Sequence, residues 1–338
     1  DPLASEAIRA PTPAPQMSIA GYDSDDNLDL LGVRWRPADS NGDVGRDHYV
    51  QWSNKGLRIF AKADGSLIAG PVAGNAIWSG FGQPCEVANG GDPIVLYDHL
   101  ADRWLFSQFT SAEYADGHQC IAITQGSSPL GPYFLYDYVF PAQLNDYPKL
   151  GIWADAPERA GVAWGEQSGY LLSVNKYRRN LGLFIFAGAG VVAFDRDAML
   201  AGDPVARAVD FGDLTCDQEC FFSLQPAHLE GDRLPPTGTC QPVVQAFDDE
   251  VWGTGSGEDG YQFWEVCVDW DMPTDSLFSL GPRVNTAEFD AELCADRPCV
   301  PQPGTATRLA TLSHYTMNRF TARYLADSPH PAGLRGVV

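Results

Sequence analysis

The sequence has few basic residues and no long apolar run. Lys and Arg number 22 against 44 Asp and Glu, which gives a formal net charge of −22. Because the chain is this acidic, it repels polyanions. Nucleic acid and anionic membrane surfaces are therefore poor candidate partners. No apolar stretch is long enough to cross a bilayer, so membrane insertion is not expected. We interpret the acidity as a solubility feature, with cation binding as the alternative.

The familiar catalytic signatures are also missing. The chain has no GxSxG elbow, no P-loop and no GxGxxG between a strand and a helix. Its six histidines show neither HxH nor HExxH spacing, and no CxxC pair occurs. Hydrolysis through a serine nucleophile, nucleotide chemistry and a zinc ribbon are therefore poorly supported.

Convincing helical periodicity is scarce, whereas short β-type runs alternate with turn residues throughout the 338-residue chain. Four such runs between Asp92 and Tyr138 form one meander of the kind that makes a propeller blade. Similar units contain the runs 48–60, 146–194, 242–280 and 313–324, with Leu183–Phe186 and Val191–Phe194 read as separate strands. We therefore predict an all-β fold, a β-propeller of about five or more four-stranded blades. A pair of β-sandwiches is the competing architecture.

The chain divides into a Pro/Ala-rich extended arm, residues 1–20, and the propeller domain, residues 21–338. The first residues lack a basic region followed by an apolar core, so we expect that any signal peptide has been removed. Eight cysteines in an acidic, Gly- and Pro-rich chain suggest disulfides and an oxidising compartment. We predict the pairs Cys294–Cys299 and Cys85–Cys120. Pairing among the other four stays open: Cys216, Cys220, Cys240 and Cys267.

Several segments together resemble a family of uncharacterised secreted bacterial proteins with sialidase-like β-propeller character. The segments that carry the resemblance are Asp39–Gln51, Gly80–Cys85, Gly91–Leu105, Asn145–Trp153 and Cys299–Thr305. The resemblance implies the fold and secretion, and it carries over no catalytic residue.

One departure from that family concerns the end of the chain. Its members continue past the strand near Arg323 into further blades, whereas this sequence ends at Gly336-Val-Val338. An open sheet edge would invite aggregation. We therefore expect the N-terminal segment, a second chain or a removed segment to complete the ring.

An oxygen-rich segment, DSNGDVGRD, holds the candidate metal ligands Asp39, Asn41, Asp43 and Asp47. Hard cations such as Ca²⁺ prefer several carboxylate and carbonyl oxygens close together, so Ca²⁺ is the candidate cofactor. The EF-hand pattern fails, because Val44 stands where its glycine should follow. A turn stabilised by Asx hydrogen bonds is the alternative.

Two aspartates mark comparable places in consecutive units. Asp92 precedes Pro93 at the start of an apolar strand, and Asp146 lies near the start of the next unit. The starts of innermost strands line one mouth of a propeller channel, so these carboxylates could form an acid/base pair for glycoside hydrolysis. The candidate acids are Glu86, Glu166 and Glu219. The alternative is that both aspartates bind backbone amides at blade junctions.

Histidines and tryptophans supply the candidate ligand-binding residues. His48 and His314 each precede a tyrosine at the start of a strand-like run and could face the channel as base or ligand. Trp153, like other strand tryptophans, could stack on a sugar. Structural histidines and blade-to-blade packing are the competing interpretations.

The leading functional prediction is a secreted, extracellular or periplasmic binding or scaffold module for a glycan or protein partner. A glycoside hydrolase that uses Asp92, Asp146 and a glutamate is one alternative. A subunit of a larger extracellular assembly is the other.

Overall fold

The computed structural model describes residues 14–110, 114–156, 167–180, 183–215, 221–253, 255, 257–291, 298–309, 315–316, 318–325 and 334–337. Antiparallel sheets dominate it, and the helices and 3-10 turns among these residues are short. They are α1 (Ser24–Leu31), η1 (Gly74–Trp78), α2 (Gln83–Val87), α3 (Arg196–Ala201), α4 (Asp249–Trp252) and η2 (Pro273–Asp275). None of them is long and apolar enough to span a bilayer. The all-β prediction is confirmed.

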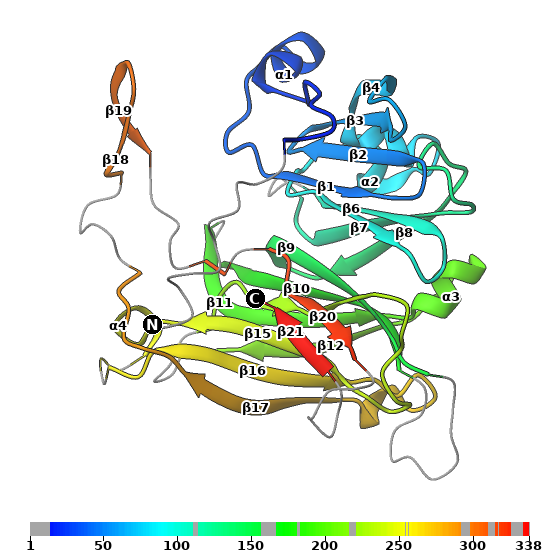
Figure 1. Ribbon diagram of the computed structural model, residues 1–338. Coiled ribbons are helices and arrows are strands. Elements are labelled where there is room, and N and C mark those ends of the chain that lie inside the picture. The colour runs from blue at the N-terminus through cyan, green and yellow to red at the C-terminus, as the bar shows by residue number, and fades with distance from the viewer. Residues whose placement is uncertain are drawn as a thin grey trace.

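Each of the first two sheets is a four-stranded meander in sequence order (Figure 1). The first blade contains β1 (Ser40–Val44), β2 (His48–Ser53), β3 (Gly56–Ala61) and β4 (Leu67–Ala73). The second contains β5 (Ile94–Asp98), β6 (Arg103–Phe109), β7 (Gly117–Thr124) and β8 (Tyr133–Phe140). The second blade matches the meander predicted between Asp92 and Tyr138, because its apolar runs and polar turns are both strong local signals.

The third blade has the longest strands, and the fourth begins with a strand of two residues. The third contains β9 (Gln143–Ala154), β10 (Ser168–Asn180), β11 (Leu183–Phe194) and β12 (Ala208–Leu214). The fourth contains β13 (Gln225–Pro226), β15 (Gln241–Phe247), β16 (Gly260–Cys267) and β17 (Leu277–Asn285). The prediction of two separate strands within residues 183–194 is wrong. They form one strand, and its register against β10 shifts between Lys176 and Tyr177.

A fifth sheet has three strands among the residues described, so it departs from the predicted four. It consists of β14 (His228–Glu230), β20 (Thr321–Tyr324) and β21 (Leu334–Val337). β14 runs parallel to β20, so segments almost one hundred residues apart are paired. The hairpin of β18 (Val300–Gln302) and β19 (Thr305–Leu309) projects from the body (Figure 1).

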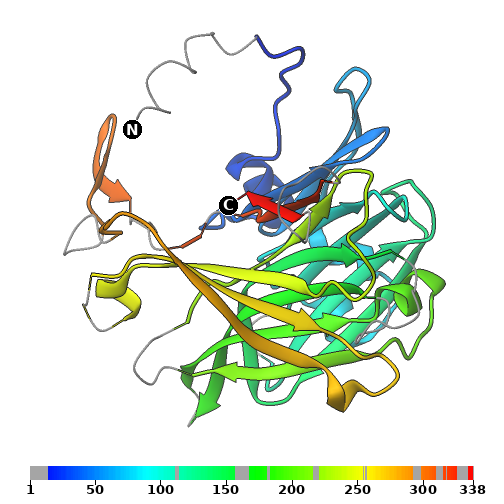
Figure 2. The same ribbon diagram turned by 60° about the horizontal axis from the view of Figure 1, so that its bottom comes forward.

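Apolar clusters fill the spaces between neighbouring blades. Trp52 and Ile59 of the first blade pack with Phe106 of the second, and Leu171 of the third packs with Trp264 of the fourth. Burial of such side chains stabilises each junction by about 1.5–3 kcal/mol per residue. Strands β1, β5 and β9 contact one another in order, and β9 also contacts β13 and β14. The sheets thus pack face to face around a set of inner strands, which is a β-propeller (Figure 2).

The last strands are tied to the first blade. Arg319, just before β20, forms a 2.9 Å ion pair with Asp43 of β1. The described N-terminal segment packs instead on the outside of the first blade, where the Gly21 carbonyl accepts a hydrogen bond from Arg58 and α1 contacts β4. Among the described residues the fifth sheet is built from β14, β20 and β21, and the described N-terminal segment adds no strand to it. Completion of the ring by a second chain stays a prediction.

Candidate active site

Three carboxylates come from similar places in three consecutive blades. Asp39 directly precedes β1, Asp92 lies two residues before β5, and Asp146 lies in β9. Because these inner strands are neighbours, all three side chains line one cavity of about 400 Å³, which we call the carboxylate cavity. The structure therefore brings together Asp92 and Asp146, the pair singled out by sequence. It adds Asp39, which the sequence analysis had assigned to a calcium loop.

The backbone around the carboxylate cavity is held in an uncommon conformation. Asp39, Asp92 and Tyr147 have φ angles of 41°, 44° and 52°, and Asn54 has a φ of 46°. All four line the carboxylate cavity. Left-handed φ values in residues other than glycine cost on the order of 1–3 kcal/mol each and gather at functional sites. The chain therefore accepts strain where it positions these side chains.

Burial changes the acidity of all three carboxyl groups. Burial and the nearby charge of Asp146 raise the pKa of Asp92 to about 6. Burial also raises the pKa of Asp146, against a hydrogen bond that it forms with the Asp92 carboxyl. Burial and the charge of Asp92 raise the pKa of Asp39. The Asp92–Asp146 pair thus keeps a proton to a higher pH than an isolated aspartate does, because neighbouring carboxyls resist ionising together.

A lysine lies next to the three carboxylates. Lys149 lines a second cavity of about 260 Å³ that shares Asp39, Asp92 and Tyr147 with the carboxylate cavity. Its ammonium donates to the Pro148 carbonyl at 2.9 Å and lies 3.6 Å from the centroid of the Tyr147 ring. Burial lowers the pKa of Lys149 to about 8, although the charges of Asp92, Asp39 and Asp146 oppose this shift.

Asn54 holds Asp39 in place from the turn between β2 and β3. Its side-chain amide donates to a carboxylate oxygen of Asp39 and, at 3.0 Å, to the Pro37 carbonyl. The neighbouring Lys55 donates to the carbonyls of Asn89, at 2.6 Å, and Gly90. Both residues are buried, so the wall below Asp39 is rigid.

Aromatic side chains complete the carboxylate cavity. The rings of Tyr147 and Tyr315 lie with their centroids 4.9 Å apart, and Trp35 lies at the rim with 42% of its surface exposed. Sugars bind proteins through such aromatic faces beside a few polar groups. Carboxyl groups with altered acidity therefore share one cavity with stacking surfaces.

Glu86, a predicted acid, lies in α2, which connects the first blade to the second. Its carboxylate accepts hydrogen bonds from the amides of Gly80, at 2.9 Å, and Gly82, at 2.7 Å. These bonds lower the pKa of Glu86, whereas a general acid needs a raised one. Glu86 does not line the carboxylate cavity and holds a loop. The other two candidates, Glu166 and Glu219, lie outside the described residues.

The predicted calcium segment is mostly a strand rather than a loop. Asn41 and Asp43 lie on β1 and accept hydrogen bonds from the amides of Val95 and Tyr97 on β5, at 2.7 Å and 2.9 Å. Asp47 is exposed beyond the β1 end, whereas Asp39 faces the carboxylate cavity. The loop conformation on which we based this site is therefore wrong, because the oxygens of Asn41 and Asp43 bind backbone amides. Binding of Ca²⁺ itself stays a prediction.

Another acidic group brings ligand atoms together. Asp248, Glu250 and Asp259 have carboxylate oxygens within 4.8 Å of one another, a spacing that could hold a cation. Asp248 already caps α4 through the amides of Glu250 and Val251, and it accepts from Ala291. Asp259 accepts from Asp249 at 3.0 Å. The backbone thus uses much of their hydrogen-bonding capacity.

Two predicted ligand-binding residues lie away from the carboxylate cavity. His48 begins β2, where its carbonyl accepts from Gly45 at 2.9 Å. Trp153 is 1% exposed, packs with Leu229 and Phe320, and donates its indole N–H to the Thr239 carbonyl. Its ring therefore offers no face to a sugar and serves blade packing. His314 lies outside the described residues.

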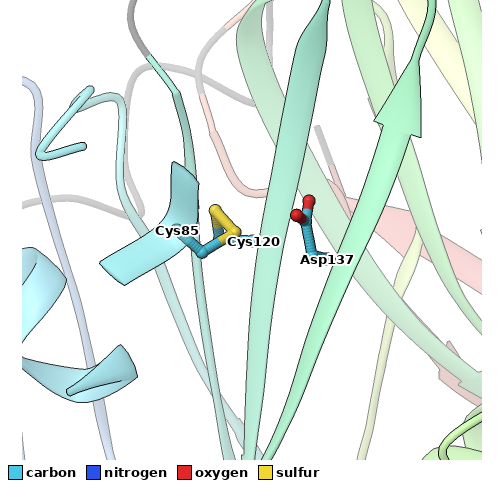
Figure 3. Close-up of side chains that lie close together, drawn as sticks. All are labelled: Cys85, Cys120 and Asp137. Carbon is cyan, nitrogen blue, oxygen red and sulfur yellow. A yellow bond between two sulfur atoms is a disulfide. The ribbon is translucent and has the colours of Figure 1, made fainter. Parts of the chain in front are cut away.

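The cysteines support an oxidising compartment. The predicted Cys85–Cys120 disulfide is present, with a Cα–Cα distance of 5.7 Å (Figure 3). Asp137, the third side chain in that view, accepts a 2.8 Å hydrogen bond from His118. Cys240 pairs with Cys267, which the sequence had left open. Cys299 is also disulfide-bonded, and its predicted partner Cys294 lies outside the described residues, as do Cys216 and Cys220.

Sequence analysis missed Lys149, Tyr147, Trp35 and Asn54. A signal existed for the first two, because both belong to the same segment as Asp146, DYPKLGIW. Trp35 and Asn54 come from loops whose positions depend on the folded first blade. Nothing in the local sequence distinguishes them from residues of other loops.

No protein-family model matches the sequence, and no curated protein matches it. Solved structures show distant likeness at 11% identity. A Bacillus subtilis arabinanase has a TM-score of 0.33 over 71% of this chain and 79% of its own. An exo-β-1,3-galactanase of Clostridium thermocellum has a TM-score of 0.26 over 79% and 66%. A mutant of the Synechocystis apocarotenoid oxygenase has a TM-score of 0.36 over 71% and 48%.

These scores carry no information on activity. The propeller architecture rests on the sheets and contacts of this chain, and the carboxylate cavity rests on its own residues.

Proposed function

We propose that the protein is a secreted glycoside hydrolase and that the carboxylate cavity is its active site. The observation that carries this proposal is the gathering of Asp92 and Asp146 in one cavity with the separately held Asp39. Disulfides favour an oxidising compartment and agree with secretion.

The proposed chemistry assigns different roles to the pair and to Asp39. The proton held between Asp92 and Asp146 passes to the glycosidic oxygen as the bond from that oxygen to the anomeric carbon breaks. Ionised Asp39 accepts a proton from the water that adds to the anomeric carbon. The products are a free reducing end and an alcohol. The acid/base pair predicted from sequence was Asp92 with Asp146, whereas here the base is Asp39. Two neighbouring carboxyls cannot lie on opposite sides of a sugar.

A purely glycan-binding module is the competing function, and the aromatic residues alone would satisfy it. What favours the hydrolase is the cluster of acids with raised pKa values, since a binding site gains nothing from holding buried carboxyls together. The strained backbone at Asp39 and Asp92 adds to this argument.

The test is a screen of purified protein against varied polysaccharides that records both retention and released reducing ends. We expect Asp92→Asn and Asp39→Asn each to lower sugar release by about 10²–10⁴-fold, the usual effect of removing an acid or base. Glu86→Gln is the matched control, because that carboxylate lies outside the carboxylate cavity.

Three results are informative. Release that vanishes in Asp92→Asn while retention persists supports the hydrolase. Retention without release in the unchanged protein points to a binding module and overturns the proposal. Release that survives both aspartate substitutions places the chemistry elsewhere and also overturns it.

A further inference from the structure

We propose that Trp35 and Arg36 form an outer subsite for a sugar unit that carries an anionic group, so that the substrate is an acidic polysaccharide. This inference deepens the proposed function and rests on it for hydrolysis, although binding can be measured separately. The anionic group is a carboxylate or a sulfate ester, since a guanidinium recognises both.

Trp35 presents a fixed aromatic surface at the rim of the carboxylate cavity. The Lys55 ammonium lies 4.6 Å from the centroid of its ring and is itself anchored by the Asn89 and Gly90 carbonyls. One ring face is therefore occupied by a buried cation, while 42% of the residue is exposed. A ring held on one side and open to solvent is suited to stack on the apolar face of a pyranose.

Arg36 lies beside it with its guanidinium unpaired. The residue is exposed, lines the carboxylate cavity, and forms no ion pair or hydrogen bond with any residue that the structure describes. Two other arginines show the contrast, because Arg34 pairs with Asp25 at 2.5 Å and Arg319 pairs with Asp43 at 2.9 Å.

The chain has 44 acidic residues and 22 basic ones, yet none of the described carboxylates pairs with Arg36. The nearest candidate along the chain, Asp39, takes its hydrogen bond from Asn54 instead. Arg36 thus keeps its five N–H donors for a group that is not part of this chain.

The local charge also favours an anionic ligand. Burial raises the pKa of all three carboxyls of the carboxylate cavity, which lessens their negative charge at mildly acidic pH. Three cations face them or lie beside them: Arg36, Lys55 and Lys149. These three cations gather at one site within a chain whose net charge is −22.

That contrast has a consequence for binding. The remainder of the protein repels an acidic polymer, so attachment depends on the few cations at the site. Loss of Arg36 should therefore affect acidic chains strongly and neutral chains little.

The experiment measures binding with chains that differ only in charge. A galacturonic acid oligomer is compared with its methyl ester, and a sulfated galactan oligomer is compared with its desulfated form. Affinity is measured by calorimetry on the Asp92→Asn protein, so that turnover does not deplete the ligand. Released reducing ends are measured separately on the protein with Asp92.

We expect at least one acidic chain to bind about tenfold or more tightly than its neutral counterpart. Arg36→Gln should remove that difference and leave neutral binding unchanged. Arg34→Gln is the matched control, because this nearby exposed arginine is already paired with Asp25. Trp35→Ala should weaken all bound chains, and Trp35→Phe should restore much of the affinity. The intrinsic fluorescence change on binding should be lost in both tryptophan variants.

Equal affinity for charged and neutral chains, no binding of either acidic chain at millimolar concentration, or an unaffected Arg36→Gln protein would each overturn the inference. Binding that depends on Arg36 but releases no sugar would support the subsite and contradict the hydrolase. Sugar release from neutral chains that is unchanged in Arg36→Gln would support the hydrolase and contradict the subsite. The preferred chain, carboxylated or sulfated, identifies the anionic group.

Discussion

Arg319 and Asp43 form an ion pair of 2.9 Å although they lie 276 residues apart in the chain. The pair joins the segment before β20 to the first inner strand. Asp43 also accepts a hydrogen bond from the amide of Tyr97, so one carboxylate connects three blades. The contact closes the ring with side chains, because the described strands of the first and fifth sheets are not hydrogen-bonded to one another.

Breaking this closure should destabilise the fold more than breaking a surface pair. Arg319 and Asp43 are 20% and 18% exposed, whereas Arg34 and Asp25 are 48% and 70% exposed. We expect Arg319→Met to lower the free energy of unfolding by about 1–3 kcal/mol, because it leaves a half-buried carboxylate unpaired. Arg34→Met should cost less than about 1 kcal/mol. Urea denaturation of both variants measures the difference, and equal losses would contradict the closure role.

The buried ion pair between the second and third blades should matter still more. Arg196 binds Asp98 through two hydrogen bonds of 2.7 Å and 3.1 Å, and Tyr170 donates to the same carboxylate at 2.9 Å. Asp98 is fully buried. Arg196→Met should therefore cost about 3–5 kcal/mol, since it strands a buried charge.

Tyr170→Phe is the matched comparison, because it removes one hydrogen bond to that charge and should cost about 1.5–3 kcal/mol. Thermal or urea denaturation gives both values. A smaller loss for Arg196→Met than for Tyr170→Phe would contradict the assignment.

Asp92 should make the stability of the protein depend on pH. Burial and the charge of Asp146 raise its pKa from 3.8 to about 6. The folded state therefore holds a proton that the unfolded chain has released, and the free energy of unfolding falls as the pH rises from about 4 to about 6. The loss from this group is about 3 kcal/mol at 1.36 kcal/mol per pKa unit.

Asp92→Asn removes that titration. The variant should be more stable than the unchanged protein at pH 8 and similar to it at pH 4. Urea denaturation at several pH values tests this expectation, with the exposed Asp47→Asn as control. Parallel profiles for the unchanged protein and Asp92→Asn would be the contrary result.

Lys149 should set the pH at which the carboxyl pair loses its proton. Its charge lowers the pKa of Asp92, so its removal should raise that pKa by about 1–2 units. In Lys149→Met the decline of kcat/KM on the alkaline side of the pH profile should move to higher pH. Lys149→Arg, which keeps the cation, should show a smaller shift.

Carboxyl titration by NMR gives the same pKa without activity. An unchanged Asp92 titration in Lys149→Met would show that the lysine is too far away or too well screened to act on the pair.

The second blade could be predicted from sequence because its determinants are local. Alternating and continuous apolar runs give β5–β8, and the polar turn before Arg103 separates the first two of them. The first inner strand could not be predicted in this way. Its sequence, SNGDV, has one apolar residue, because β1 contacts the next blade through the side chains of Asn41 and Asp43. A polar inner strand looks like an oxygen-rich loop.

The same limit explains the candidate site. Asp92 and Asp146 were recognisable because each aspartate lies close to the start of a strand that follows turn residues. Asp39 was assigned to the wrong structure together with its strand. Trp35 was missed because its proposed role in binding depends on the contact of its ring with Lys55, and this contact joins two loops.

The sequence by itself determined the class of fold, the second blade, the Cys85–Cys120 disulfide and two of the three clustered carboxylates. These follow from side-chain periodicity, turn residues and cysteine content, which act over a few residues or mark a compartment. Only the tertiary structure decided how the ring closes, which carboxyl joins the pair and which groups hold protons. Those properties depend on burial and on contacts between residues far apart in the chain. Asp92 and Tyr147 are 55 positions apart, and Asp43 and Arg319 are 276 apart. A local sequence pattern cannot predict such contacts.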